Sequence, residues 1–197
     1  MDGRLSPPWT LQEAARVHEA ALADTLEAVA ATSASRRVLA LEGRPGDWLP
    51  AGFDVVAPRS GTLGNLLFGV FEDCFHVSNE PVLLIGMDTP QVTPDHLGGA
   101  GMLLETSADA VVGCTPGGGT WMIGLSYLHP GAFAGVPASD DDTADAQIER
   151  LRDCGYQVAL TEELRDLGNA RDAVELAGLR PGSRLAAAVD AAISDAR

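Results

Sequence analysis

The chain has 197 residues, 46% hydrophobic and 21% charged, so it has the composition of a globular protein and can bury a sizeable core. Its net charge of −15, from 28 acidic and 13 basic residues, repels nucleic-acid backbones and anionic membrane surfaces. No window reaches about 18 apolar residues and the amino terminus has no apolar signal region, so we expect a cytoplasmic protein with no nucleic-acid partner and no membrane span.

Predicted helices and strands alternate along the chain, beginning with a capping box of Thr10 and Glu13 before an alanine-rich run. The predicted helices cover residues 11–31, 66–75, 94–104 and 143–154, with one or two more from residue 171 onward. The predicted strands cover residues 37–41, 53–56, 82–86, 110–112, 120–125 and 157–160. This alternation predicts a single α/β domain over residues 1–197, with a helical segment at residues 171–197.

The strand at residues 82–86 is followed by a lone carboxylate, Asp88. Every position of this run is apolar or small, which predicts a central parallel strand covered on both faces. Open α/β sheets bind ligands beyond the carboxyl ends of their strands, and a carboxylate there suits a hard divalent cation that also holds phosphates. The alternative is that Asp88 only caps the turn into the helix that begins at Thr93 and Pro94.

Three consecutive glycines, Gly117, Gly118 and Gly119, join two predicted strands. Glycines let backbone amides approach an anionic ligand closely, and Trp121 beside them is a candidate for stacking on a sugar or base. The alternative is a flexible loop followed by a buried tryptophan. No Lys-Ser or Lys-Thr pair follows, so the loop is not of the Walker type.

Five segments together resemble, in order and spacing, a bacterial family of glycosyltransferase-A-like proteins of undefined substrate. They are residues 4–8 (RLSPP), 20–26 (AALADTL), 84–90 (LIGMDTP), 117–125 (GGGTWMIGL) and 164–166 (LRD), and they span nearly the whole chain. The family looks like a branch of the nucleotide-diphospho-sugar transferase superfamily. The resemblance therefore implies a three-layer α/β/α sandwich with a Rossmann-like, mostly parallel sheet of the glycosyltransferase-A type.

The resemblance also implies a function, metal-dependent glycosyl transfer from a nucleotide-diphosphate sugar to an unknown acceptor. Asp88 would hold Mg²⁺ or Mn²⁺ against the diphosphate, where the ion neutralises charge on the leaving group, and Asp166 would be a second metal contact. The residues implied to face the nucleotide sugar are Arg4, Gly117, Gly118, Gly119 and Trp121.

The sequence departs from the family's pattern at three places. The family opens with a strand and a Gly-x-x-Lys-Thr-Arg-Leu loop, and we expect this strand to be absent here, with only Arg4 matching the loop. Gly117 replaces an aspartate, and Gly168 replaces the second aspartate of an Asp-x-Asp-Thr motif. Two alternatives therefore stay open, a catalytically silent scaffold or partner-binding protein that retains the fold, and a nucleotidyltransferase, which ordinarily needs the cationic loop.

Three further features are weaker candidates. His129 precedes a Pro-Gly turn and is either a metal ligand or a surface-loop histidine, and the run Asp140 to Asp142 either binds a cation or caps the helix after it. Cys114 lies near the glycines, but no histidine is placed to activate it.

Overall fold

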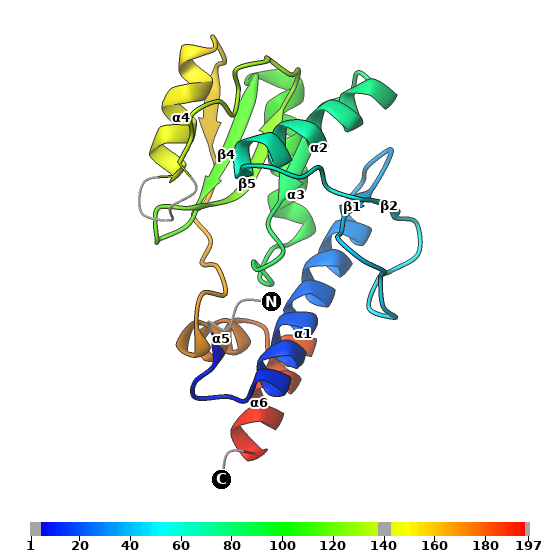
Figure 1. Cartoon of the computed structure of the whole chain (residues 1–197), viewed down its shortest axis with the longest axis vertical. Coiled ribbons are helices and arrows are strands. Elements are labelled where there is room, and N and C mark those ends of the chain that lie inside the picture. The colour runs from blue at the N-terminus through cyan, green and yellow to red at the C-terminus, as the bar shows by residue number, and fades with distance from the viewer. Residues whose placement is uncertain (1–4, 138–142, 196–197) are drawn as a thin grey trace.

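The computed structural model describes residues 5–137 and 143–195 (Figure 1). The helices are α1 (Leu11–Ala31), α2 (Leu63–Val77), α3 (Pro94–Thr106), α4 (Thr143–Asp153), α5 (Ala170–Leu179) and α6 (Arg184–Asp195). The strands are β1 (Val38–Ala40), β2 (Asp54–Val56), β3 (Val82–Ile85), β4 (Ala110–Cys114), β5 (Thr120–Leu125) and β6 (Val158–Leu160). Each predicted element is present, with small shifts at its ends.

Local sequence signals begin and end these helices. The hydroxyl of Thr10 accepts a hydrogen bond from the N–H of Glu13, whose carboxylate accepts one from the N–H of Thr10, as the capping box predicts. Thr93 caps α3 in the same way, with Pro94 at its first position. Gly155 follows α4 with a φ of +90°, a left-handed conformation that favours glycine.

The strands form two separate sheets. In the larger sheet the order is β3-β5-β4-β6, and β5 runs antiparallel to both neighbours while β4 and β6 are parallel. Three of its four strands therefore share one direction. Strands β1 and β2 form a parallel pair of their own.

The prediction of a central parallel strand at residues 82–86 is wrong in one respect. Strand β3 lies at the edge of the four-stranded sheet, and its one paired neighbour among the described residues is the antiparallel β5. A uniformly apolar run indicates that both faces of a strand are covered, but it carries no information on whether both edges are paired.

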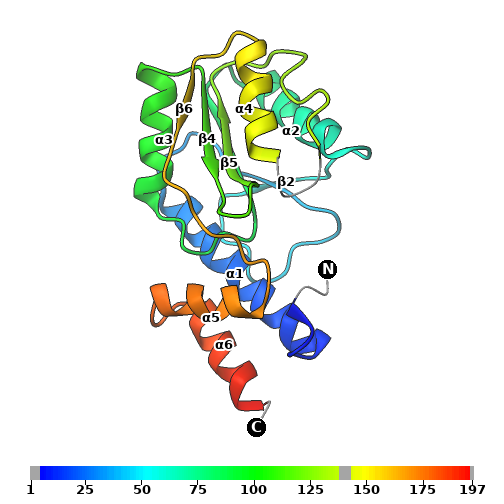
Figure 2. The same cartoon turned by 90° about the vertical axis from the view of Figure 1, so that its left-hand side faces the viewer.

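Helices cover both faces of the four-stranded sheet, as Figure 2 shows edge-on. Helix α3 and the carboxyl half of α1 pack on one face, in a cluster that includes Ala28, Leu97, Ala100, Leu104, Val111 and Met122. Helices α2 and α4 pack on the other face, in a cluster that includes Phe71, Ile148, Leu151, Val112, Ile123 and Leu125. These layers confirm the predicted three-layer α/β/α class.

A third cluster joins the amino half of α1 to α5 and α6, beyond the end of the sheet in Figure 1. Val17 and Ala21 of α1 contribute to it, together with Leu176, Leu185 and Val189. Leu5 and Leu167 are also buried in this cluster. The helical segment predicted at residues 171–197 is thus α5 and α6 up to residue 195. No helix in the described residues is long and apolar enough to cross a membrane.

Candidate functional site

Asp88 and Asp166, the two carboxylates expected to act together, lie on adjoining segments. Asp88 follows β3 at the carboxyl end of the strand, and Asp166 lies in the segment after β6. The backbone N–H of Leu167 donates to the carbonyl oxygen of Asp88 at 2.8 Å, which joins the two segments directly. Asp88 and Asp166 are separated by 78 positions in the sequence (166 − 88), and the fold brings both to the carboxyl ends of the strands.

The segment that carries Asp166 reaches this edge because it follows β4 beyond the end of β6. The N–H of Thr161 donates to the carbonyl of Val112 at 3.1 Å, and the N–H of Leu164 donates to the carbonyl of Cys114 at 3.2 Å. The chain therefore crosses the carboxyl end of β4 before it meets the turn after β3. This is the edge at which α/β sheets ordinarily bind ligands.

Two side-chain hydrogen bonds join the turn at residues 88–91 to the carboxyl-terminal part of the chain. The amide of Gln91 donates to the carbonyl of Arg165 at 2.6 Å, and Nη1 of Arg180 donates to the carbonyl of Pro90 at 2.8 Å. Neither Gln91 nor Arg180 was predicted from the sequence, because each contacts a residue far away in the chain. Gln91 and Arg165 are separated by 74 positions, and Arg180 and Pro90 by 90 positions.

The Asp88 side chain is half-buried and lies close to the backbone of Gly86. A Cβ atom added to Gly86 would lie 3.0 Å from Oδ1 of Asp88, so the glycine gives this carboxylate its room. Thr93, and not Asp88, accepts the capping hydrogen bond of α3. The neighbouring Thr89 is 1% exposed, and its hydroxyl has no hydrogen-bond partner among the described residues.

The glycine loop does not present three free amides. The N–H of Gly118 donates to the carbonyl of Thr115 at 3.0 Å, and the N–H of Gly119 donates to its hydroxyl at 3.1 Å. The carbonyl of Gly118 in turn accepts from the N–H of Ala144 at the start of α4. The loop is a tight turn, so of these three glycines only Gly117 has an N–H without a partner in the part of the chain described. This corrects the expectation that all three amides face a ligand.

Trp121 belongs to the hydrophobic core. Its side chain is 2% exposed and packs against Gly113, where an added Cβ would lie 2.4 Å from the indole ring. The indole N–H donates to the carbonyl of Glu162 at 3.0 Å. The alternative of a buried tryptophan therefore describes the structure, and no face of the ring is open for stacking on a sugar or base.

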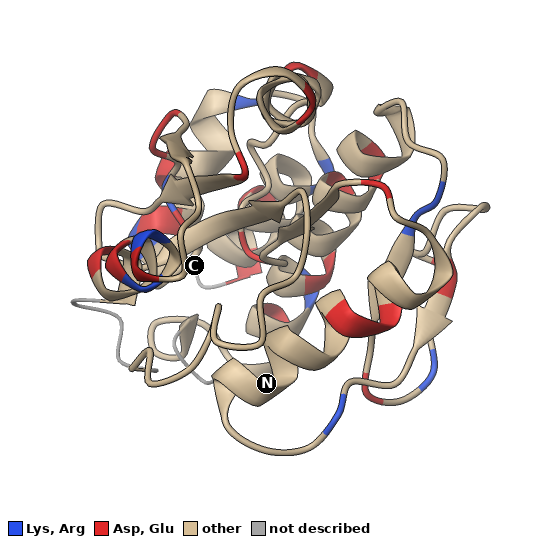
Figure 3. Cartoon of the chain, turned by 90° about the horizontal axis from the view of Figure 1, so that it is seen from above, with Lys and Arg blue, Asp and Glu red and all other residues tan. Residues whose placement is uncertain are grey.

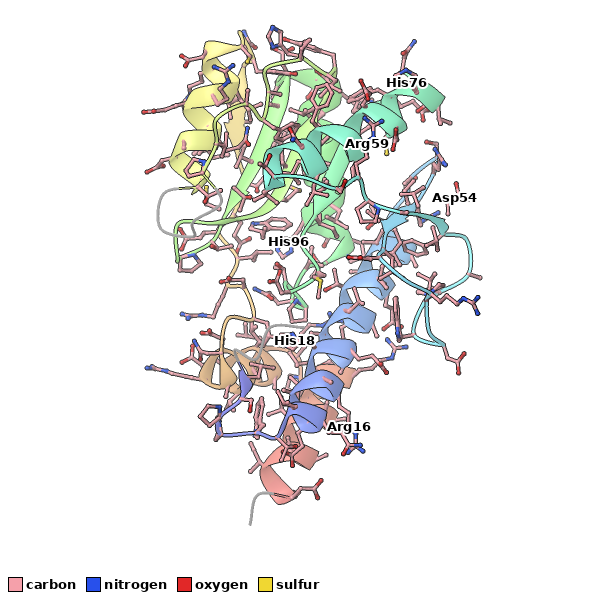
Figure 4. The ribbon with its side chains drawn as sticks, in the orientation of Figure 1. Arg16, His18, Asp54, Arg59, His76 and His96 are labelled. Atoms are coloured by element: carbon pink, nitrogen blue, oxygen red, sulfur yellow. The ribbon has the colours of Figure 1, made fainter. Side chains whose placement is uncertain are left out.

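His96 is a further titratable side chain beside Trp121. Its ring lies edge-on to the indole, with the ring centres 6.3 Å apart, and Nε2 lies 3.5 Å from the carboxylate of Glu162. Figure 4 shows His96 at the end of the sheet that faces α1, α5 and α6. The helix start at Thr93 places His96 in the first turn of α3, which the sequence indicates. Its contact with Glu162 depends on the tertiary fold and could not be predicted.

The remaining candidates contribute less. Arg4 and the run Asp140 to Asp142 lie outside the described residues. Nδ1 of His129 accepts a hydrogen bond from the N–H of Gly131 at 3.0 Å, in the turn after β5 and thus at the opposite edge of the sheet from Asp88. Burial raises the pKa of the half-buried Cys114 thiol, which disfavours the thiolate.

Residues 14–140, more than half of the chain, match the model of a family described as an uncharacterized protein conserved in bacteria (DUF2064). The chain belongs to this family. No curated protein matches it. Its fold resembles a crystal structure of a protein from Desulfovibrio desulfuricans G20 that is provisionally described as a nucleotide-diphospho-sugar transferase. The TM-score is 0.84 at 20% identity, over 98% of this chain and 90% of that chain, which shows a shared fold.

Two cavities of the DUF2064 chain lie away from Asp88 and Asp166. One of about 420 Å³ is lined by Asp24 and Glu27 of α1 and by the connection from α5 to α6, and one of about 30 Å³ lies between α2, β5 and α4. Neither is lined by Asp88 or Asp166. Figure 3 shows acidic residues on many elements of the ribbon, with the basic residues scattered among them.

Proposed function

We propose that this DUF2064 chain transfers a sugar from a nucleotide-diphosphate donor to an acceptor, with Mg²⁺ or Mn²⁺ held at Asp88 and Asp166. The observation that carries the proposal is the hydrogen bond from Leu167 to Asp88, which brings two carboxylate residues together at the carboxyl edge of the sheet. The shared fold with the protein from Desulfovibrio desulfuricans G20 supports the same reading.

The side chains of Asp88 and Asp166 fit such an ion, but they supply only part of its coordination shell. Carboxylate oxygens are the ligands that Mg²⁺ prefers, and this ion commonly takes only one or two from the protein, with water and substrate phosphates completing its shell. No group of three or more His, Cys, Asp or Glu side chains that would hold a metal exists among the described residues. We therefore expect weak binding of the ion alone and stronger binding together with a diphosphate.

The turn after β3 would orient the Asp88 carboxylate in this role. Gly86 leaves space for it, and Gln91 and Arg180 fix the turn through their hydrogen bonds to Arg165 and Pro90. When bound, the ion would offset the charge that develops on the departing diphosphate. Since Trp121 is buried and two glycine amides are already paired, we do not include them among the donor-binding groups.

Isothermal titration with a panel of nucleotide-diphosphate sugars, each with and without Mn²⁺, tests the proposal. We expect heat that depends on Mn²⁺ for at least one donor, and an affinity at least about tenfold weaker in Asp88→Asn and Asp166→Asn. Asp153→Asn, an exposed carboxylate at the end of α4, is the matched control and should bind as the parent does. If no donor gives heat that depends on Mn²⁺, the chain is not a metal-dependent transferase.

A catalytically silent scaffold is the second candidate, because several expected ligand groups are engaged in structure. Two of three glycine amides are paired, Trp121 is in the core, and neither cavity reaches Asp88. The titration separates the candidates when a nucleoside triphosphate is added to the panel. Analysis of the products then decides. Release of a nucleoside diphosphate from a nucleotide sugar, with water as the sugar acceptor, identifies a transferase, and release of pyrophosphate from the triphosphate in the presence of a phosphorylated acceptor identifies a nucleotidyltransferase. Binding without either release favours a scaffold.

A further inference from the structure

The larger cavity, of about 420 Å³, has a lining that fits a hydrophilic ligand. Its size is that of a small-molecule site, about 300–1,000 Å³, but such sites are usually lined by apolar and aromatic side chains. Among the described residues that line this cavity, only Pro181 has an apolar side chain. The others are Asp24, Glu27, Arg180, Gly182, Ser183 and Arg184. The cavity therefore suits a molecule that carries charge and hydroxyl groups.

The charged side chains of the lining, two carboxylates and two guanidinium groups, sum to zero but are unevenly paired. Nη1 of Arg184 lies 2.8 Å from the carboxylate of Glu27 and 3.7 Å from that of Asp24. Asp24 also accepts hydrogen bonds from the backbone N–H groups of Arg184 and Leu185. Both carboxylates thus have partners within the fold, and Arg180 is the charged group that is left over.

The guanidinium group of Arg180 has no carboxylate partner among the described residues. It is half-buried, and its Nη1 donates to the carbonyl of Pro90 at 2.8 Å. The other N–H groups of this side chain have no hydrogen-bond partner within residues 5–137 and 143–195. A guanidinium held on one side offers a planar pair of donors on the other, which matches the two oxygens of a carboxylate.

The amino terminus of α6 does not itself supply an anion site. The N–H groups of Arg184 and Leu185 donate to Asp24, and the N–H of Ala186 donates to the hydroxyl of Ser183 at 3.1 Å. Because these amides are already paired, an anion in the cavity depends on the side chain of Arg180.

We propose that this cavity binds a small hydroxylated carboxylate, such as a sugar acid, whose carboxylate pairs with Arg180. One negative charge matches the one unpaired guanidinium, whereas a phosphate monoester carries about two charges and would leave one of them beside Asp24 and Glu27. The carboxylate of Glu27 is 61% exposed and has acceptor sites for ligand hydroxyls besides the one that Arg184 uses.

The position of Arg180 makes this ligand the sugar acceptor, a role that rests on the proposed function. Pro90, which accepts from Arg180, lies two residues after Asp88, and two residues span at most about 7 Å. The acceptor thus lies beside the donor at Asp88. In the transfer, a hydroxyl oxygen of the ligand bonds to the anomeric carbon of the sugar. The bond from that carbon to the diphosphate breaks, and the hydroxyl proton passes to solvent.

Binding is tested with the full 197-residue chain and sodium gluconate at constant ionic strength, without metal or nucleotide. In an NMR titration we expect saturable shifts of the amide signals of Gly182 and Ser183, with a Kd of about 1 mM. Sorbitol lacks the carboxylate and hexanoate lacks the hydroxyls, so each should bind at least about tenfold more weakly. Glucose 6-phosphate should also bind more weakly than gluconate, because of its second charge.

Protein variants provide a second comparison. Arg180→Gln should weaken gluconate at least about tenfold, and Arg180→Lys, which keeps the charge but loses the planar fork, at least about threefold. Arg16→Gln is the matched control, because Arg16 is an exposed residue of α1 that does not line the cavity. Figure 4 places it on the part of α1 that lies farther from the sheet. If the Arg180 variants do not fold by circular dichroism, the four small molecules alone decide.

The site and the acceptor role can fail separately. No saturable binding of gluconate, equal binding of sorbitol, or an unchanged affinity in Arg180→Gln overturns the site, and tighter binding of glucose 6-phosphate overturns the class of ligand. With a nucleotide sugar that binds in the presence of Mn²⁺, gluconate should become glycosylated by mass spectrometry and hexanoate should not. Gluconate binding without any donor that depends on Mn²⁺ supports the site and overturns the proposed function. Binding of both without glycosylated gluconate overturns the acceptor role.

Discussion

The carboxylate of Asp24 offers the sharpest test of how the carboxyl-terminal helices are held. It lies on α1, is 2% exposed, and accepts hydrogen bonds from the backbone N–H groups of Arg184 at 3.2 Å and Leu185 at 2.9 Å. These are the first two residues of α6, so a side chain from one helix caps the amino terminus of another. Replacing Asp24 with alanine leaves both groups without this partner.

The geometry sets the size of the effect. A hydrogen bond to a charged group contributes about 1.5–3 kcal/mol, and loss of an amino-terminal cap costs about 0.5–2 kcal/mol. The N–H of Leu185 is on a buried residue, whereas Arg184 is exposed and water can replace part of its bond. We therefore expect Asp24→Ala to lower the free energy of unfolding by about 3 kcal/mol. Asp24→Asn, which keeps one acceptor oxygen, should lower it by about 1 kcal/mol.

Urea unfolding followed by circular dichroism measures both changes. Glu27→Ala is the matched control, because Glu27 also contacts Arg184, at 2.8 Å, but is 61% exposed and should matter by less than about 0.5 kcal/mol. If Asp24→Ala unfolds at the same urea concentration and with the same slope as the parent, Asp24 does not hold α6 against α1.

Three further predictions follow from individual contacts. Gly113→Ala should lower the free energy of unfolding in urea by about 1–3 kcal/mol, because its Cβ would lie 2.4 Å from the ring of Trp121. Gly99→Ala, whose added Cβ would have nothing within 4 Å, should stabilise α3 by about 0.5–1 kcal/mol. Equal effects of the two substitutions would contradict the packing of Trp121 against Gly113. Burial raises the pKa of Tyr156 from 10.0 to about 12, so the neutral phenol is favoured in the fold, and this stabilisation is complete below pH 10 and lost as the pH rises to about 12. Unfolding measured across that interval should show a loss that Tyr156→Phe lacks, and an identical pH dependence would refute it. Arg180→Ala removes the hydrogen bond to Pro90 and should speed amide exchange at Leu167, whose N–H binds Asp88; unchanged exchange would show that Arg180 does not hold the turn.

Much of the fold was predictable because its signals are local. The capping box at Thr10 starts α1, Gly155 ends α4, and short apolar runs mark the strands. The association of Asp88 with Asp166 was predicted from the family resemblance, since nothing in the spacing of two residues so far apart requires contact. The structure joins the two segments through the hydrogen bond from the N–H of Leu167 to the carbonyl of Asp88, and a shared metal site of the two carboxylates stays a prediction.

The glycine loop and Trp121 show where sequence reasoning failed and which signal was available. Consecutive glycines indicate a backbone that is free to turn. They do not indicate that Thr115 accepts hydrogen bonds from the amides of Gly118 and Gly119. For Trp121 a signal did exist. Strands β4 and β5 form an antiparallel hairpin that pairs Gly113 with Met122, so the glycine lies beside the tryptophan, and a glycine next to a large ring in a buried hairpin indicates core packing.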